Sequence, residues 1–177
     1  MVDAAKRMNL LIKDLLEFSR ITVKGNMFTR ISLNDACIAA LENLKETISE
    51  SGSEIVFDNL PEVMGDSVQI MQVFQNLIGN AVKFRHADRP SLISITSEIH
   101  DGNWQISVSD NGIGIADTTQ DIFEIFRRLH SGNQYPGSGV GLAICKRIIT
   151  RHGGRIWVEP GLGGGATFRF TLPSVLE

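Results

Sequence analysis

The sequence predicts one α/β domain of ordinary size, preceded by a single amphipathic helix. Three observations support this. The chain has 177 residues, which is enough to bury a hydrophobic core. After residue 26, segments with the periodicity of helices alternate with segments that have the periodicity of strands. Most of the 17 glycines follow His100, and several lie where one predicted element meets the next, so a functional site is expected at these junctions.

The composition excludes several classes of protein. Hydrophobic residues make up 42% and charged residues 21%, which is typical of a globular chain and not of a disordered one. The longest apolar runs are only a few residues, so the sequence predicts neither a membrane span nor a signal peptide. A net charge of −3 gives no support to nucleic-acid binding. Cys37 and Cys145 lack the spacing of a zinc site or a disulfide framework and favour a cytoplasmic location.

The first predicted helix covers residues 3–21. Its narrow and nearly heptad apolar stripe favours packing against another helix or in a coiled-coil seam. Gly25 and Asn26 are typical of a helix end. The apolar residues of this stripe, mostly three or four positions apart, are Met8, Leu11, Ile12, Leu15, Leu16 and Phe18.

Capping residues and periodicity predict the elements of the α/β unit. Ser32, with Asp35 three residues later, predicts the start of a helix that runs to about residue 49. Asp66 is typical of the N-cap of the long helix predicted over residues 68–85. The other predicted elements are strands over residues 28–31, 54–58, 91–99, 104–109, 155–158 and 167–172, a short helix near residues 121–127 and a helix over residues 140–151.

The long helix has two distinct faces. Its apolar face consists of Met71, Phe74, Ile78 and Val82, with Leu77 and Ala81 at the edge. Its polar face consists of Gln72, Asn76, Asn80 and Lys83. Amide oxygens can bind a hard cation and the lysine can bind phosphate, although a solvated helix face also accounts for this pattern. Two asparagines four residues apart are unfavourable in a helix interior, which suggests a functional reason for them.

Two glycine-rich segments lie at junctions between elements. Residues 110–115 (DNGIGI) follow a predicted strand directly, and their glycines allow a flat ligand to approach the backbone. The carboxylate of Asp110 would accept a hydrogen bond from the amine of adenine, where guanine presents an oxygen instead. An ordinary Asp-Asn-Gly turn is the alternative. Residues 137–141 (GSGVG) precede a predicted helix, where exposed N–H groups suit phosphate, but they match neither the P-loop nor the Rossmann pattern.

Taken in order along the chain, these motifs resemble those of sensor histidine kinases. Residues 72–84 resemble the N box, residues 110–115 the first glycine box, Phe123 and Phe126 the F box, and residues 137–142 (GSGVGL) the second glycine box. Residues 165–168 (GATF) look like the last glycine-threonine element of the same domain, and residues 7–20 like the second helix of the dimerisation and phosphoacceptor hairpin. Within the family, the chain is most similar to phytochrome-type and PAS-linked kinases.

The resemblance implies a fold and a division into domains. The implied fold is an α+β two-layer sandwich of the Bergerat ATP-binding type, in which about three helices cover one face of a mixed β-sheet. Residues 1–25 would be the C-terminal helix of a dimerisation hairpin, and residues 26–177 the ATP-binding catalytic domain. The chemistry would be in-line transfer of the ATP γ-phosphoryl group to a histidine, achieved by positioning and charge neutralisation.

The resemblance also implies roles for individual residues. Asn80 would hold Mg²⁺, Asp110 would recognise the adenine amine, and Thr167 would line the adenine end of the pocket. Lys83 and Arg128 would offset the charge of the phosphates. The ATP-binding residues implied in this way are Asn76, Asn80, Lys83, Phe84, Asp110, Gly112, Gly114, Ile115, Phe123, Arg128, Gly137, Ser138, Gly139, Val140, Gly141, Leu142 and Thr167.

The phosphoacceptor histidine of the family has no counterpart in this sequence. The family places it on the first helix of the hairpin, and none of the four histidines of this chain has a comparable position. The chain is therefore expected to be a fragment that binds Mg-ATP without phosphorylating itself. The implied partners are a histidine-containing hairpin of the parent kinase and the receiver domain of a response regulator. The parent is expected to be a homodimer, either soluble or anchored to a membrane.

Three other functions remain open at the level of the sequence. ATPases of the gyrase, heat-shock-chaperone and mismatch-repair type share the glycine boxes but carry a glutamate where this chain has Asn76, and an amide cannot accept a proton from water. An anti-sigma serine kinase also lacks an internal histidine, but the hairpin-like first helix argues against it. A signalling or dimerisation module with a degenerate nucleotide site is disfavoured by the intact motifs.

Overall fold

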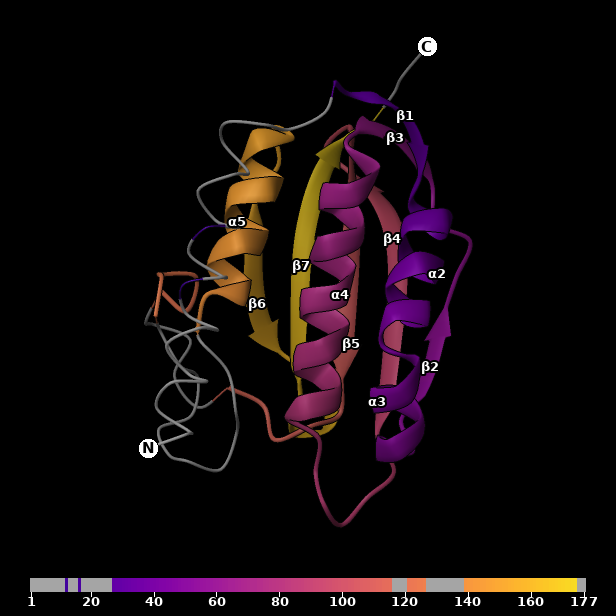
Figure 1. Ribbon diagram of the computed structural model, residues 1–177, viewed down its shortest axis with the longest axis vertical. Coiled ribbons are helices and arrows are strands. Elements are labelled where there is room, and N and C mark those ends of the chain that lie inside the picture. Colours follow the sequence, from indigo (N-terminus) through magenta and orange to yellow (C-terminus); the bar gives the residue numbers. More distant parts are fainter. Residues whose placement is uncertain (1–11, 13–15, 17–26, 116–120, 127–138, 175–177) are drawn as a thin grey trace.

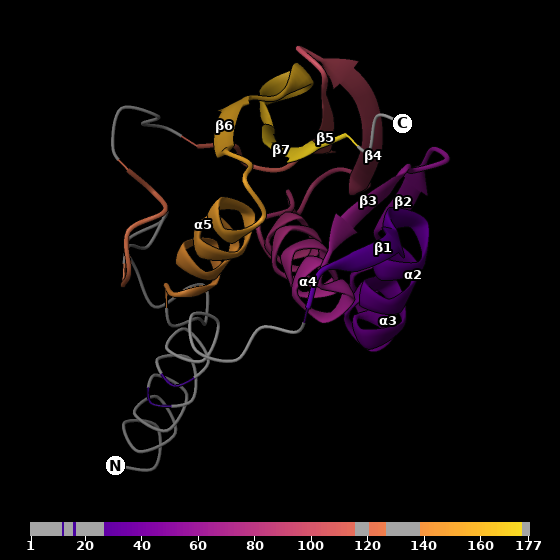
Figure 2. The same cartoon turned by 90° about the horizontal axis from the view of Figure 1, so that it is seen from above.

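The fold consists of a five-stranded β-sheet and a layer of helices that covers one of its faces (Figures 1 and 2). The computed structural model describes residues 12, 16, 27–115, 121–126 and 139–174. Its elements are β1 (Thr29–Ser32), α2 (Leu33–Asn43), α3 (Lys45–Ser51), β2 (Glu54–Phe57), β3 (Glu62–Gly65), α4 (Ser67–Lys83), β4 (Leu92–His100), β5 (Asn103–Asp110), α5 (Gly141–Arg151), β6 (Ile156–Pro160), a 3-10 turn (Leu162–Gly164) and β7 (Ala166–Pro173).

The large sheet is mixed, as the resemblance implies. Its strand order is β2-β4-β5-β7-β6, with β2 parallel to β4 and every other pair antiparallel. Strands β1 and β3 form a separate antiparallel pair beside the helical layer (Figure 2). The expected two-layer α+β sandwich is confirmed. Among the helices of the described residues, none combines the length and the apolar character needed to cross a bilayer.

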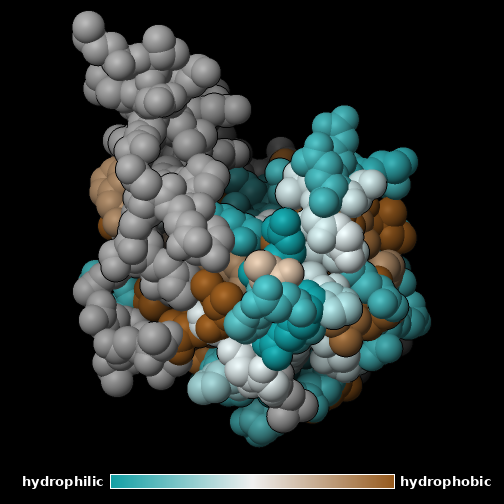
Figure 3. Space-filling view, turned by 90° about the horizontal axis from the view of Figure 1, so that it is seen from below, coloured by the Kyte–Doolittle hydropathy of each residue, from teal (hydrophilic) through white to brown (hydrophobic). Residues whose placement is uncertain are grey.

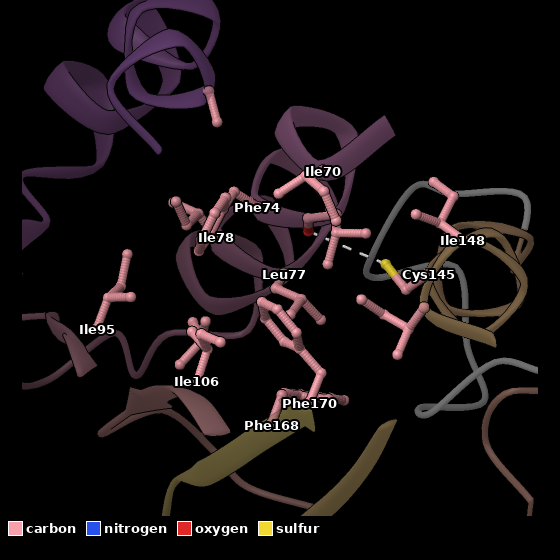
Figure 4. Close-up of a cluster of buried hydrophobic side chains, with 14 of the residues drawn as sticks. Ile70, Phe74, Leu77, Ile78, Ile95, Ile106, Cys145, Ile148, Phe168 and Phe170 are labelled. Atoms are coloured by element: carbon pink, nitrogen blue, oxygen red, sulfur yellow. Dashed lines mark hydrogen bonds between the residues drawn. The ribbon is translucent and has the colours of Figure 1, made fainter. Parts of the chain in front are cut away.

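The hydrophobic core lies between α4 and the sheet (Figure 4). Phe74, Leu77 and Ile78 of α4 are fully buried and point toward the strands, where Phe170 meets Phe74 edge-on at 5.9 Å between ring centroids. Cys145 of α5 is buried between α5 and α4, with its Sγ facing the Val73 carbonyl of α4. Burial raises the pKa of its thiol to about 12. The apolar face expected for the long helix is therefore its core face.

The structure corrects the predicted elements in three places. The helix that begins at Ser32, whose hydroxyl accepts a hydrogen bond from the Asp35 N–H, is divided at Leu44 into α2 and α3. Strand β3 was not predicted, because only its pairing with β1 identifies so short a segment as a strand. The short helix near residues 121–127 is wrong over residues 121–126, which form turns. There, Phe126 has a left-handed φ of 65°, which does not continue a helix.

Most of the predicted first helix lies outside the described residues, and so do Arg128, Gly137 and Ser138. Within that helix, Ile12 and Leu16 are described, and both are helical. Their side chains are 52% and 53% exposed, which agrees with one turn of the apolar stripe.

The ends of α4 and α5 that lie away from the site are joined by His152. This buried side chain accepts a hydrogen bond from the Asp66 N–H at Nε2 (3.0 Å) and contacts the Ile148 carbonyl through Nδ1 (2.8 Å), which makes Nδ1 the protonated nitrogen. Asp66 in turn caps α4 by accepting from the N–H groups of Val68 and Gln69. His152 therefore fixes the C-terminus of α5 to the N-terminus of α4.

We expect stability to depend on pH through His152. Burial lowers the pKa of His152 below its ordinary value of 6.5, and protonation would remove the acceptor of the Asp66 N–H. As the pH falls from about 7.5 to about 5.5, the unfolded chain therefore binds a proton that the folded domain resists, and the free energy of unfolding decreases. Urea unfolding across this range measures the slope. The variant His152→Gln should be less stable but show a flatter dependence, and an unchanged slope would assign the effect to other groups.

Candidate functional site

The ends of α4 and β5 and the starts of α5 and β7 lie at one end of the molecule (Figure 1). A cavity opens there among α4, β5, the loop after β5, and β7. Figure 3 looks onto this end, where hydrophilic residues gather beside hydrophobic ones. The cavity thus joins segments that are far apart in the sequence. Its lining residues are Asn80, Phe84, Asp110, Gly114, Ile115, Ala166 and Phe168.

Asp110 provides the carboxylate of the cavity. Its Oδ1 accepts hydrogen bonds from the N–H groups of Gly112 (2.8 Å) and Ala166 (3.3 Å), which fix the orientation of the side chain. Within the described residues Oδ2 has no hydrogen-bond partner, so it can accept from a ligand. Burial raises the pKa of Asp110, while the two N–H groups and the charge of Arg89 act in the opposite direction and favour the carboxylate.

The glycines of the first glycine box are needed for contacts within the protein. A Cβ at Gly112 would lie 2.4 Å from the Phe84 carbonyl oxygen, and one at Gly114 would lie 2.3 Å from the Gly164 carbonyl oxygen. Gly114 also has a φ of 70°, which L side chains rarely adopt. The sequence predicts room for a ligand here, whereas the structure shows that the loop uses this room to pack on α4 and on the turn before β7.

The polar face of α4 points toward the cavity and toward α5. Asn80 lines the cavity, and the Lys83 Nζ lies 4.6 Å from the centre of the Phe84 ring. Asn76 lies against the start of α5, since a Cβ at Gly141 would be 3.1 Å from its Oδ1. The Nδ2 of Asn76 is buried, and the Asn76 side chain lies close enough to the Cys145 thiol of α5 to lower the pKa of that thiol against the effect of burial. A solvated helix face therefore does not account for this stripe.

The described part of the second glycine box forms the N-terminus of α5. Among the described residues, no side chain caps this terminus, and Gly139 has a φ of 75°. Gly141 lies against Asn76, whereas Val140 and Leu142 are buried in the core. Their contribution to a site would therefore come from the backbone.

The predicted site residues outside the cavity lining include Thr167 and Phe123, which make their contacts elsewhere. Thr167 points to the opposite face of β7, because side chains alternate along a strand, and its hydroxyl donates to the Ser109 Oγ (3.0 Å). Phe123 packs edge-on against Phe168 in the core, at 6.4 Å between ring centroids. Conversely, Ala166 and Phe168 line the cavity and were not predicted. Because side chains alternate along a strand, the sequence indicates that Ala166 and Phe168 share one face of β7 and Thr167 the other. Only the arrangement of the sheet shows which of these faces meets the cavity.

Comparisons with known proteins agree with this arrangement. Residues 65–176 match the family described as histidine kinase-, DNA gyrase B-, and HSP90-like ATPase. The chain is 49% identical to cyanobacterial phytochrome A of Nostoc sp. strain PCC 7120 over 173 residues, which is 97% of this chain and 22% of the relative. It is 36% identical to the adaptive-response sensory kinase SasA of Synechococcus sp. strain JA-2-3B'a(2-13) over 95% of this chain and 46% of that kinase. The chain thus spans less than half of either relative.

Solved structures point to the same family. The catalytic domain of the histidine kinase ThkA, in a nucleotide-free form, is 30% identical with a TM-score of 0.69, and the match covers 84% of this chain and 98% of that one. Full-length ShkA, solved in complex with AMPPNP, is 30% identical with a TM-score of 0.76 over 96% of this chain and 36% of ShkA. The chain therefore belongs to the family of histidine kinase-, DNA gyrase B- and HSP90-like ATPases, and its fold and motifs are those of a histidine-kinase ATP-binding catalytic domain.

Proposed function

We propose that this domain binds Mg-ATP and presents the γ-phosphate to a histidine on a dimerisation hairpin, from which the phosphoryl group passes to an aspartate of a response-regulator receiver domain. The observation that carries the proposal is the Asp110 carboxylate in the wall of a cavity that Asn80 of the N box also lines. We further propose that residues 1–25 belong to the second helix of that hairpin, that the parent protein is a homodimer and that the domain works in the cytoplasm.

The described residues suit the two ends of ATP differently. The Oδ2 of Asp110 would accept a hydrogen bond from the exocyclic amine of adenine, and Phe84, Ile115 and Phe168 would provide apolar walls for the base. On the phosphate side, the N–H groups at the start of α5 present the positive end of a helix dipole. The proposal also assigns phosphate contacts to Lys83 and Arg128, the latter outside the described residues.

Magnesium would bind at this site together with the triphosphate. The described residues contain no group of three acidic, histidine or cysteine side chains that could hold a metal ion in the absence of a bound nucleotide. Mg²⁺ commonly takes most of its oxygens from substrate phosphates and water, and Asn80 offers one amide oxygen from the protein. The side chain of Asn76 lies against the start of α5, where the phosphates are proposed to bind. When bound, Mg²⁺ would neutralise charge on the phosphates.

Transfer to a histidine is favoured over hydrolysis at this site. Asn76 occupies the position at which the related ATPases carry a glutamate, and its amide cannot accept a proton from water. A neutral imidazole on another domain is already a nucleophile and needs less activation. Within this chain, His152 is unsuited to that role because it is buried and both of its ring nitrogens are engaged. The chain alone is therefore proposed to bind ATP without phosphorylating itself on histidine.

We expect Asn80→Ala to abolish the magnesium-dependent part of ATP binding. Calorimetry with AMPPNP, with and without Mg²⁺, measures this, because the wild-type domain should gain affinity from Mg²⁺ and the variant should not. With a supplied hairpin that carries the phosphoacceptor histidine, the rate of phosphoryl transfer should fall at least about a hundredfold, since catalysis here depends on positioning and charge.

Gln75→Ala is the matched control. Gln75 lies on the same helix, and its side chain accepts a hydrogen bond from Asn43 of α2, away from the cavity. Binding of AMPPNP by the wild-type domain without phosphorylation of the supplied hairpin would contradict the kinase proposal and favour a non-catalytic module. An acid-labile, base-stable phosphoprotein formed by the chain alone would contradict the absence of a phosphoacceptor.

A further inference from the structure

Arg89 connects two loops that form one side of the cavity. It lies in the segment between α4 and β4, and its Nη2 donates hydrogen bonds to the carbonyls of Asn111, Gly112 (3.2 Å) and Gly163 (3.1 Å). The first two carbonyls belong to the first glycine box and the third to the turn before β7. Its Nε is buried and has no hydrogen-bond partner among the described residues. The hydrogen bonds that hold this guanidinium are therefore those of Nη2 to the two loops.

The two loops held by Arg89 touch through their backbones. A Cβ at Gly165 would lie 1.8 Å from the Asp110 carbonyl oxygen, so the turn and the end of β5 are in direct contact. The segment that carries Arg89 is itself anchored, because Asn111 accepts a hydrogen bond from the Leu92 N–H and donates one to the Pro90 carbonyl (both 2.9 Å). Arg89 is thus fixed by the same loop that it holds.

Arg89 also affects the charge of Asp110. Among the described residues it is the charged side chain whose field lowers the pKa of that carboxyl, against the rise caused by burial. An ionised Asp110 can only accept hydrogen bonds, as contact with an exocyclic amine requires. One guanidinium therefore fixes the loops around Asp110 and favours its accepting form.

We propose that Arg89 is a positioning residue for nucleotide binding: it holds the first glycine box against the turn before β7 and so fixes Asp110 for contact with the base. This inference rests on the proposed adenine site. Arg89 acts through Asp110 and the loop backbones, so its removal should weaken recognition of the base and leave the phosphate contacts unchanged.

The test compares Arg89→Gln and Arg89→Lys with the wild-type domain by calorimetry. We expect Arg89→Gln to weaken AMPPNP and ADP binding by the same factor, about tenfold for the loss of charged hydrogen bonds. The ratio of the two affinities, which reports the γ-phosphate contacts, should not change. Arg89→Lys keeps the charge and one donor group and should recover part of the loss. As the pH is lowered, the affinity of Arg89→Gln should begin to fall at a higher pH than that of the wild-type domain, because the pKa of Asp110 rises further.

Arg85→Gln is the matched control, since Arg85 lies four residues away and donates to the Val82 carbonyl at the end of α4. It should bind both nucleotides like the wild-type domain. Equal affinity of Arg89→Gln and wild type, or a loss confined to AMPPNP, would overturn the inference. If Arg89→Gln does not fold, Arg89→Lys decides: wild-type affinity for both nucleotides would overturn the inference, and an equal loss of affinity for AMPPNP and ADP would support it. If the wild-type domain binds no nucleotide, the proposed function fails instead.

Discussion

The variant Asp110→Asn is expected to lose about a hundredfold in affinity for AMPPNP. The hydrogen bond from the adenine amine to a carboxylate is lost, and two N–H donors, the asparagine amide and the adenine amine, face each other instead. The asparagine Oδ1 can still accept from the N–H groups of Gly112 and Ala166, so the side chain keeps its orientation. Its Nδ2 then takes the place of Oδ2 and faces the exocyclic amine of adenine. Calorimetric titration of AMPPNP into the two proteins measures the loss.

Guanine nucleotide is the control ligand for this variant. Guanine presents an oxygen where adenine has its amine, so the preference for AMPPNP over GMPPNP should shrink or reverse in Asp110→Asn. Because burial raises the pKa of Asp110, the folded domain disfavours its charge, and the neutral amide should not lower the unfolding temperature of the nucleotide-free domain. Unchanged selectivity in a folded variant would show that Asp110 does not read the base.

The variant Gly165→Ala is expected to lower the free energy of unfolding by about 3 kcal/mol, the upper part of the range for overpacking. The new Cβ would lie 1.8 Å from the Asp110 carbonyl oxygen and 2.8 Å from the Asn111 Cα, and these backbone atoms cannot move aside as a side chain could. Since φ at Gly165 is −80°, the effect is steric and not conformational. The displaced strand also weakens the hydrogen bond from Ala166 to Asp110, so AMPPNP binding should fall too.

Gly79→Ala is the matched control for this variant. Gly79 lies within α4, and the nearest atom to an added Cβ is the Leu44 Cδ2 at 3.9 Å, an ordinary contact. Here alanine should stabilise the domain by about 0.5 to 1 kcal/mol, because glycine is unfavourable inside a helix. Urea unfolding of both variants gives the comparison. A Gly165→Ala domain as stable as the wild type would mean that β5 and β7 can separate at this point without loss.

Local signals in the sequence were sufficient for most of the fold. Ser32 and Asp66 cap α2 and α4 as their side chains predict, and β4 and β5, both predicted as strands, pair as neighbours in the sheet. These features depend on neighbours close in sequence. Strand β3 was not predictable in this way because it depends on pairing with β1, and no side-chain cap at Leu44 marks the break between α2 and α3.

The sequence by itself determined the chemistry of the site: a carboxylate after a strand, a polar stripe on one helix and glycines at two junctions, all local patterns of residue type and spacing. Only the tertiary structure decided which face of each element meets the cavity. It placed Ala166 and Phe168 in the wall and Thr167 outside it, because a strand exposes alternate residues to opposite faces. It also assigned Arg89 a position between two loops 22 and 74 residues further along the chain, a contact that no local pattern could indicate.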